Sequence, residues 1–489
     1  NFNISGPIVK DVLSFRLYGN YNKTDADATD INSSTSSSTY NAAGRDGVTN
    51  KDLGARLAWR ISPQQTLTLD ANYSRQGNIY TGDTQNNTSS TLTQQLANDG
   101  AENSRIYRQS YALTHEGTWS WGNSRVIAQF DRTNNSRYEE GLTGGPEGMP
   151  TATNYVDSLL KTMRFSGEAH IPFTWGVDHV LTVGAEYEND SLSDPSSMRQ
   201  GLTDQGQTDI FTSLNATRGG KSKQTNWAVF VEDNISLTDR TQLIPTLRFD
   251  HNSQSGANIS PGLNISHQLN SNWTIKGGIA RAYKAPNLYQ STDNYLLYTR
   301  GNGCPVDFAS TENGKATRCY LLGNSNLKPE TSINKEIGVE YANNGYLASL
   351  AYFHNAYKNK IISGDTILER YEGTSRVSYL LQWENAKRAV VEGLEGNVTL
   401  PFTEDLKWVN NFTYMLQSKD KTTNNPLSVI PKYTINSTLS WQVLPKLDTL
   451  LTFTYYGRQK PREFAYNRTE NTTGLSHREL GSYGVWGIS

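Results

Sequence analysis

The chain has 489 residues, and its 45 Lys and Arg against 47 Asp and Glu give a formal net charge of −2. This balance excludes a nucleic-acid-binding protein held mainly by phosphate neutralisation, because there is no overall basic excess. Hydrophobic residues make up only 35% of the chain, the mean hydropathy is −0.63, and no run of apolar residues is long enough for a membrane-spanning helix.

Alternating apolar and polar residues recur from the start of the chain to its end. Clear examples are residues 13–19, 67–73, 259–266, 273–279 and 450–455. A period of two sends successive side chains to opposite faces of a strand. About 18 such segments of roughly 10 residues can be marked, the length that a tilted transmembrane strand needs. With 27 Tyr, 10 Trp and 40 Gly, the sequence predicts an all-β protein, a large antiparallel transmembrane β-barrel.

The connections between these segments fall into two alternating classes. Short, turn-like connections occur at residues 62–65, 269–272, 343–345 and 444–446. Long polar stretches lie between them, at residues 78–104, 135–156, 191–222, 284–331, 359–385 and 459–478. This alternation predicts short periplasmic turns at one rim and long extracellular loops at the other. Barrels of about 16–18 strands are water-filled porins and those of about 22 are plugged transporters, so the count leaves both open.

Four stretches resemble the barrel of TonB-dependent outer-membrane receptors: residues 279–289, 324–332, 334–338 and 390–396. Within them, Tyr283-Lys-Ala-Pro286 followed by Asn324-x-x-Leu327-Lys-Pro-Glu330 is fairly specific to that class. A narrower resemblance, to bacterial ferric enterobactin receptors, covers nearly the whole chain. It rests on residues 50–52, 73–80, 82–85, 105–113, 135–137, 140–142 and 427–433.

The resemblance implies a barrel of about 22 strands that follows an N-terminal plug domain with a TonB-contacting segment. The chain begins at Asn1, without Met or a signal peptide, and ends inside a predicted strand at Ser489. We therefore expect residues 1–489 to be a partial barrel domain, without the plug, the first strand and the last strands.

The family also implies a place and a set of partners. We expect a multi-pass barrel in the outer membrane of a Gram-negative bacterium, surrounded by lipopolysaccharide and other outer-membrane lipid. The implied partners are a ferric catecholate siderophore, the TonB-ExbB-ExbD complex reached through the plug, and bacteriocins or phage. Nucleic acid is not expected.

The cargo implied by the resemblance is an iron(III) tris-catecholate, which is trianionic and aromatic-faced. Its recognition needs Arg or Lys for charge and aromatic rings for stacking and cation–π contacts. The family's loop positions imply these ligand-binding residues: Tyr80, Arg105, Tyr107, Arg108, Arg137, Gly144, Gly145, Arg300 and Asn302.

Each of these assignments has a structural alternative. The Arg-x-Tyr-Arg spacing puts Arg105 and Tyr107 on one face of a strand and Arg108 on the other. On the alternative interpretation, Tyr107 belongs to the aromatic girdle and the arginines lie among lipopolysaccharide phosphates. The adjacent Gly144 and Gly145 either let backbone N–H groups approach a ligand oxygen or only form a tight loop.

Cys304 and Cys319 are the only cysteines, and both lie in the predicted loop at 284–331. In an oxidising envelope compartment they are expected to form a disulfide. A metal site is the weaker interpretation, because that loop contains no His.

The chain is not expected to be an enzyme. Its 7 His are scattered singly, without metal-ligand or triad spacing, and no Gly-x-Ser-x-Gly or Walker-type loop occurs. No cofactor is expected either, because iron enters within the siderophore.

We therefore expect an outer-membrane receptor that binds ferric enterobactin at its extracellular loops and imports it by TonB-dependent active transport. Two alternatives stay open on the sequence: a passive porin-type channel, and a receptor for a related catecholate such as glucosylated enterobactin. The catecholates share the iron–catecholate core that the arginines would recognise, so the sequence does not separate them.

Overall fold

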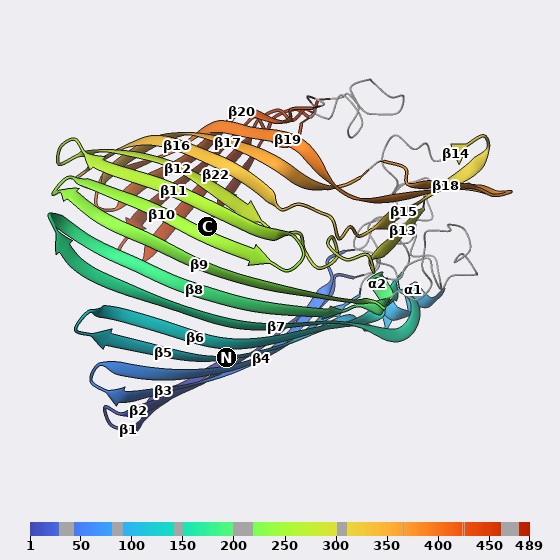
Figure 1. Ribbon diagram of the computed structural model, residues 1–489, viewed down its shortest axis with the longest axis horizontal. Helices are drawn as coiled ribbons and strands as arrows, with labels where there is room; N and C mark the ends of the chain where they lie inside the picture. The colour runs from blue at the N-terminus through green and yellow to red at the C-terminus, as the bar shows by residue number, and fades with distance from the viewer. Residues whose placement is uncertain are drawn as a thin grey trace.

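The alternating segments form long strands in the computed structural model (Figure 1). The structure describes residues 1–28, 44–80, 91–140, 150–198, 219–300, 311–364, 366–422, 424, 426–460 and 479–489. Its strands are β1 (Phe2–Val9), β2 (Leu13–Thr24), β3 (Gly47–Ser62), β4 (Gln65–Ile79), β5 (Glu102–Trp119), β6 (Gly122–Glu140), β7 (Pro150–Trp175), β8 (Val177–Ser193), β9 (Lys221–Thr238), β10 (Thr241–Asn252), β11 (Gly256–Gln268), β12 (Trp273–Lys284), β13 (Leu296–Arg300), β14 (Thr311–Glu312), β15 (Lys315–Leu322), β16 (Glu330–Asn343), β17 (Tyr346–Ser363), β18 (Glu369–Glu372), β19 (Arg376–Pro401), β20 (Leu406–Asp420), β21 (Tyr433–Leu444), β22 (Leu447–Tyr456) and β23 (Tyr483–Ile488).

Helices are few and short in the described parts of the chain. They are α1 (Thr91–Asn98) and α2 (Pro195–Met198). Within these parts, no helix has both the length and the apolar character needed to cross a membrane.

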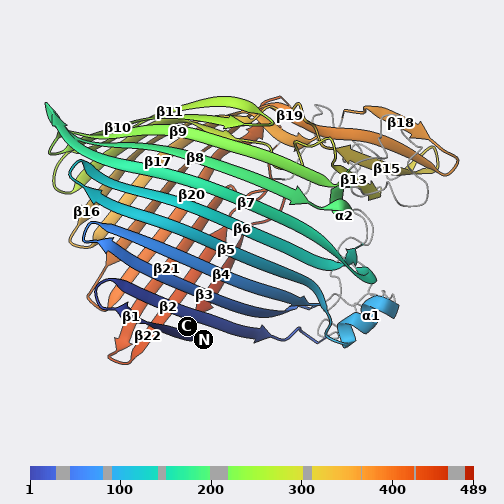
Figure 2. The ribbon, with the colours of Figure 1, turned by 60° about the horizontal axis from the view of Figure 1, so that its bottom comes forward.

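Nineteen of the 23 described strands form one antiparallel wall. Strands β1 to β12 pair in chain order, β12 pairs with β16, and β17 and β19 to β23 complete the series. Figures 1 and 2 show this sheet curved into an open barrel wall. The large antiparallel sheet is thus confirmed. In the described residues, however, no pairing joins β1 to β23, so the expected closed barrel is not formed by these strands alone.

The short turns and the larger connections lie at opposite rims of the wall. The predicted turns at 269–272 and 343–345 join β11 to β12 and β16 to β17 at one rim. At the latter turn, Asn344 and Gly345 have positive φ values of 48° and 84°, as a two-residue hairpin turn requires. Helices α1 and α2 and strands β13 to β15 and β18 lie at the other rim, the loop rim (Figure 1). The alternation is not strict, because Ser253–Ser255 is a short turn at the loop rim, between β10 and β11.

Several strands are much longer than the sequence predicts. Strands β7 and β19 each have 26 residues, against about 10 for a membrane crossing. The stretches 135–156 and 359–385, predicted as loops, therefore contain parts of β6, β7, β17 and β19. The extra length of β7 lies beyond the membrane, where both faces of a strand meet water, so no apolar alternation marks it, although the backbone hydrogen bonds continue. The extra length of β19 instead belongs to a second sheet.

A second, smaller sheet stands at the loop rim, within stretches that the sequence predicts as loops. It consists of β13, β14, β15, β18 and the first part of β19, with β15 parallel to β19. Two buried clusters stabilise it: Leu296, Tyr298, Tyr320 and Leu380, and Cys319, Leu321, Val377, Tyr379 and Leu381. Strands buried on both faces lack alternation, which explains why the prediction missed this sheet.

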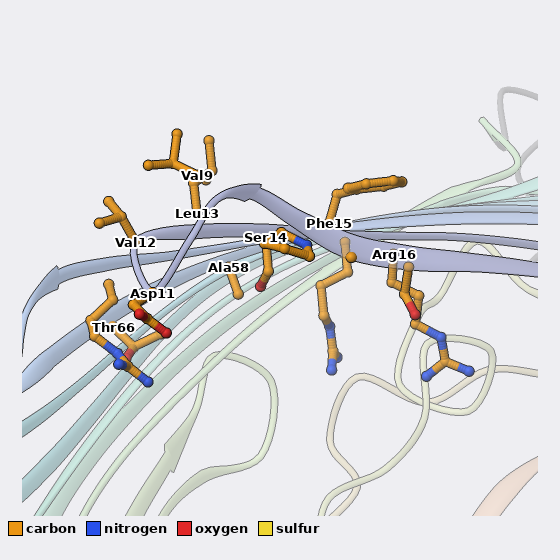
Figure 3. Close-up of a pocket in the computed structure, with 14 residues that line it drawn as sticks. Val9, Asp11, Val12, Leu13, Ser14, Phe15, Arg16, Ala58 and Thr66 are labelled. Atoms are coloured by element: carbon orange, nitrogen blue, oxygen red, sulfur yellow. The ribbon is translucent and has the colours of Figure 1, made fainter.

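The two faces of the wall differ in chemistry. Figure 3 shows Leu13 and Phe15 on one side of β2 and Ser14 and Arg16 on the other. The register brings large apolar residues of neighbouring strands together on the first face, among them Leu57, Leu69, Leu113 and Phe165. The second face carries ion pairs such as Arg56–Asp70, Arg164–Glu188 and Lys276–Glu340. In a transmembrane barrel the apolar face meets lipid, so we call the first face the outer face and the second the lumen face.

Candidate ligand-binding site at the loop rim

A buried carboxylate, that of Asp194, lies between β8 and α2 at the loop rim. Asp194 is 1% exposed. Its Oδ1 accepts hydrogen bonds from the backbone N–H of Ser197 and the hydroxyl of Ser196, both at 3.0 Å. Its Oδ2 accepts a hydrogen bond from the hydroxyl of Tyr289 at 2.8 Å. Asp194 therefore caps α2 and ties it to the segment that follows β12.

The protonation states around Asp194 follow from burial and hydrogen bonding. Burial alone would raise the pKa of the Asp194 carboxyl, but hydrogen bonds from Ser197 and Tyr289 outweigh it and hold the pKa below its usual value. Burial raises the pKa of Tyr289 to about 12, and the negative charge of Asp194 adds to this. Burial and Asp194 likewise raise the pKa of Tyr295 to about 12. At neutral pH Asp194 is ionised, while both tyrosines keep their protons and can donate hydrogen bonds.

Arg137 reaches the same cluster from β6. Its Nη2 donates to the hydroxyl of Ser197 at 2.9 Å, and its Nε lies 3.8 Å from Oε1 of Glu140. Arg137 lies opposite Ser104 of β5 in the register, which places it on the lumen face together with Arg108, four residues further along β5. Arg108 is exposed. Two of the predicted arginines thus share the lumen face near the loop rim.

Arg105 and Tyr107 lie on the outer face instead. Tyr107 is four residues from Tyr111, an exposed outer-face residue, and the pairing of β5 with β6 has no bulge between them. The Nε of Arg105 donates to Glu102 at 2.9 Å, and its guanidinium lies 4.6 Å from the ring centroid of Tyr155. The structure confirms that Arg105 and Tyr107 occupy a different face from Arg108.

The outer-face arginines are paired with an acid. Arg75 of β4 also donates to Glu102, and its guanidinium lies 6.0 Å from the ring centroid of Tyr107. The hydrogen bond from Arg75, followed by the one from Arg105, holds the pKa of Glu102 below its usual value despite partial burial. One carboxylate thus offsets part of the positive charge of two arginines at this place.

The other predicted ligand residues are placed less completely. Tyr80 is 3% exposed, and its N–H donates to the carbonyl of Ala101 at 3.0 Å. Arg300 ends β13, where it lies opposite Arg318 of β15. The following residues lie outside the described parts of the chain: Gly144, Gly145, Asn302 and Cys304. No observation tests ligand contact for any of the nine residues, and the outer-face position of Arg105 and Tyr107 favours their structural alternative.

Cys319 lies in β15 and is 1% exposed, inside one of the buried clusters of the small sheet. It is disulfide-bonded rather than a free thiol. Because Cys304 lies outside the described residues, its pairing with Cys319 stays a prediction.

Sequence reasoning missed the cluster around Asp194. A local signal was present in Asp194-Pro195-Ser196-Ser197, because an N-cap residue followed by Pro at the first helical position marks a helix start. The contact with Tyr289 joins residues 95 positions apart, so no local sequence pattern predicts it.

Two other kinds of functional site were considered, a metal site and a groove at the rim opposite the loop rim. Within the described residues, no group of three or more His, Cys, Asp or Glu could hold a metal ion. The groove drawn in Figure 3 has a volume of about 550 Å³ and is lined mainly by β1, β2, the turn between them and β3, far from the loop rim.

A curved wall of long antiparallel strands, apolar outside and charged inside, defines an outer-membrane β-barrel protein. The chain belongs to the TonB-dependent receptor family, because residues 14–489 match the family described as TonB dependent receptor-like, beta-barrel.

Relatives and solved structures show which members of the family the chain is similar to. The chain is 52% identical over 492 residues to the ferric enterobactin receptor PirA of Pseudomonas aeruginosa, covering 100% of this chain and 64% of the relative. The crystal structure of the siderophore receptor PirA from Acinetobacter baumannii matches with a TM-score of 0.86 and 46% identity, over 99% of this chain and 70% of that one. A substituted ferric enterobactin receptor of Pseudomonas aeruginosa, solved in complex with enterobactin, matches with a TM-score of 0.87 and 44% identity, over 99% and 69%.

The chain thus spans just under two thirds of the length of the PirA receptor of Pseudomonas aeruginosa. Membership of this family confirms an all-β fold built on a large antiparallel sheet, and it agrees with a receptor rather than an enzyme. The closed 22-stranded barrel and the absence of a plug stay predictions. Family membership also favours the receptor over the porin-type channel.

Proposed function

We propose that this chain is the barrel portion of an outer-membrane receptor that binds ferric enterobactin at the loop rim and imports it by TonB-dependent transport. The observation that carries the proposal is the 52% identity, over the whole chain, to a ferric enterobactin receptor. A structural relative solved with enterobactin supports the same cargo. On this proposal, a plug and further strands of the same receptor close the barrel, contact the TonB-ExbB-ExbD complex and gate import.

The lumen-face cations are the residues that we assign to the cargo. Arg108 is exposed, and Arg137 is held in place by Ser197 at the rim of the lumen. A trianionic complex entering the barrel meets these two guanidinium groups, whereas Arg105 is engaged with Glu102 on the outer face. We also assign Arg300 and Asn302 to the cargo, because the family resemblance implies that these loop positions bind the siderophore. Iron is part of the cargo, so the protein needs no metal ligands of its own.

Equilibrium binding of ferric enterobactin to the complete receptor tests this assignment. The double variant Arg108→Gln/Arg137→Gln should raise the Kd about tenfold, because each partly exposed charge contact contributes about 1 kcal/mol or less and about 1.4 kcal/mol is tenfold. The matched control, Arg105→Gln/Tyr107→Phe, changes the outer face of the same region and should leave the Kd within about twofold. An unchanged Kd in the lumen-face variant, with the barrel shown to be folded, would overturn the assignment of these residues.

Transport is tested separately from binding. Cells carrying the receptor should accumulate radioactive iron from ferric enterobactin only when TonB is present. Equal accumulation of iron in cells without TonB would contradict active transport and would favour the alternative function, a passive porin-type channel. Competition with glucosylated ferric enterobactin then shows whether the rim distinguishes the two catecholates.

A further inference from the structure

A relay of two hydrogen bonds joins Arg137, on β6, to Asp194, at the start of α2. The Nη2 of Arg137 donates to the hydroxyl oxygen of Ser197 at 2.9 Å. That hydroxyl has its own hydrogen left to donate, because a hydroxyl both accepts and donates. The carboxylate of Asp194 accepts a hydrogen bond from the Ser197 side chain as well as one from its backbone N–H. Ser197 therefore lies between the guanidinium and the carboxylate.

The interposed hydroxyl keeps Asp194 and Arg137 from forming a direct ion pair. Among the ion pairs between described residues, Arg137 has only a long one, in which its Nε lies 3.8 Å from Oε1 of Glu140. A direct carboxylate partner would occupy the forked edge that a guanidinium presents to an anionic ligand. The relay uses a single N–H of the guanidinium, so it fixes the direction of the side chain and leaves donors for another anion.

The acceptor end of the relay is firmly anchored. The backbone N–H of Asp194 donates to the carbonyl of Gly220 at 2.8 Å, and its carbonyl accepts from the N–H of Met198 at 3.0 Å. Met198 is 0% exposed, so the other end of α2 is held by burial. The hydroxyl of Tyr289 adds a hydrogen bond to Asp194 from the segment that follows β12. A side chain bonded to such a fixed group loses less conformational entropy when a ligand binds it.

We propose that Asp194 and Ser197 are positioning residues for Arg137, which hold its guanidinium in the orientation that binds the anionic cargo. This inference rests on the proposed function, because it takes Arg137 as a contact of the ferric catecholate. Neither Asp194 nor Ser197 touches the cargo. The expected effect has the opposite sign to charge repulsion, since removal of a carboxylate that only repelled the trianion would strengthen binding.

Equilibrium binding of ferric enterobactin to the complete receptor with Ser197→Ala, measured at low ionic strength, tests the relay. The change removes the hydroxyl but keeps the backbone N–H that Asp194 accepts, so α2 stays capped and only the bond to Arg137 is lost. The Kd should rise about three- to fivefold, up to the loss of one partly exposed charge contact. Amide exchange over residues 194–198 should stay unchanged, which separates lost positioning from a lost helix.

A double-mutant cycle shows whether Ser197 acts through Arg137. Arg137→Gln alone should raise the Kd by at least as much as Ser197→Ala does. In the Arg137→Gln background, Ser197→Ala should change the Kd by less than about 1.5-fold, because the group that it positions is already gone. Asp194→Ala, in the receptor that keeps Arg137, should raise the Kd by at least about threefold.

Thr162 supplies the matched control. Its hydroxyl donates to Oδ1 of Asp190 at 2.6 Å, across β7 and β8 on the lumen face. Thr162 lies opposite Asp131, which is six residues before Arg137 on β6. Thr162→Val therefore removes a hydroxyl–carboxylate hydrogen bond of the same kind away from Arg137, and the Kd should stay within about 1.5-fold. An equal loss in Thr162→Val would overturn the inference, since any such bond on this face would then matter.

The remaining outcomes separate positioning from its alternatives. An unchanged Kd in Ser197→Ala, with Arg137→Gln still impaired, overturns the inference and leaves the proposed function standing. An equal loss on Ser197→Ala with and without Arg137 overturns it as well, because Ser197 would then act independently. Tighter binding by Asp194→Ala overturns it in favour of charge repulsion. If the unchanged receptor does not bind ferric enterobactin, the proposed function fails and this inference fails with it. Unchanged heat-modifiable migration in gels shows that the variants are folded.

Discussion

Replacing Asp194 by Ala should open the α2 segment locally and leave the strand wall folded. The change removes the N-cap acceptor for Ser197, which costs about 0.5–2 kcal/mol in comparable helices. It also leaves the half-buried hydroxyl of Tyr289 without its Asp194 acceptor, at a cost of about 1–3 kcal/mol. Together these losses are about 1.5–5 kcal/mol, or roughly 10- to 5,000-fold faster amide exchange over residues 194–198.

Hydrogen exchange followed by mass spectrometry measures this effect directly. Asp194→Asn keeps an acceptor for Ser197 and serves as the matched control, so its exchange should rise by less, since a neutral acceptor binds more weakly than a charged one. Exchange in the β6–β7 region should not change. Unaltered exchange over residues 194–198 in Asp194→Ala would refute the view that this carboxylate holds α2 in place.

The pH dependence gives a second check on Asp194. The folded-state pKa of Asp194 lies below its usual value, so the carboxylate contributes stability that is fully present above the unfolded pKa of about 3.9. That contribution is lost as the pH falls through the folded-state pKa. Protection of residues 194–198 should therefore decline below about pH 4, and Asp194→Asn should lack this decline.

Two further predictions concern topology and the cysteines. Cysteines introduced at Asp99, beside α1, should react with an impermeant reagent on intact cells, whereas cysteines at Gln64 and Lys446 in the short turns should not; labelling at both rims would contradict the topology. A peptide map of the unreduced protein should show Cys304 linked to Cys319, and two free thiols there would contradict the pairing. Reduction of this bond, worth about 3 kcal/mol for a loop of about 15 residues, should loosen the small sheet and spare the wall.

The wall was predictable because its two faces meet different media. Lipid on one side and the lumen on the other impose opposite chemistry on alternate residues, and segments 67–73 and 273–279 accordingly lie in β4 and β12. The same reasoning underestimates β7, whose upper part meets water on both faces, and β19, whose first part belongs to the small sheet. Alternation does not predict the small sheet for the opposite reason: its strands are buried on both faces, by residues such as Tyr320 and Leu380.

The site was predictable only in part, because its geometry depends on long-range register. The Arg-x-Tyr-Arg spacing correctly separates Arg108 from Arg105, but it does not say which of the two faces the lumen. That assignment needs the neighbouring strands, where Asp70 lies opposite Ala112 on the face of Arg108 and pairs with Arg56. The capped helix α2 and its bond to Tyr289 depend on the close approach of distant segments.

Positive charge is not neutralised to the same extent along the lumen face, and the position of the unneutralised charge determines where an anion is attracted. Along the lumen face, acids and bases such as Arg164 and Glu188 neutralise each other across neighbouring strands. Arg108, by contrast, forms none of the ion pairs between described residues, and it lies on that face close to the loop rim. A shift of β5 by one residue would exchange Arg105 and Arg108 between the faces. On the proposed function, strand register, more than residue type, therefore decides which arginine faces a soluble anionic cargo in the lumen and which lies on the outer face.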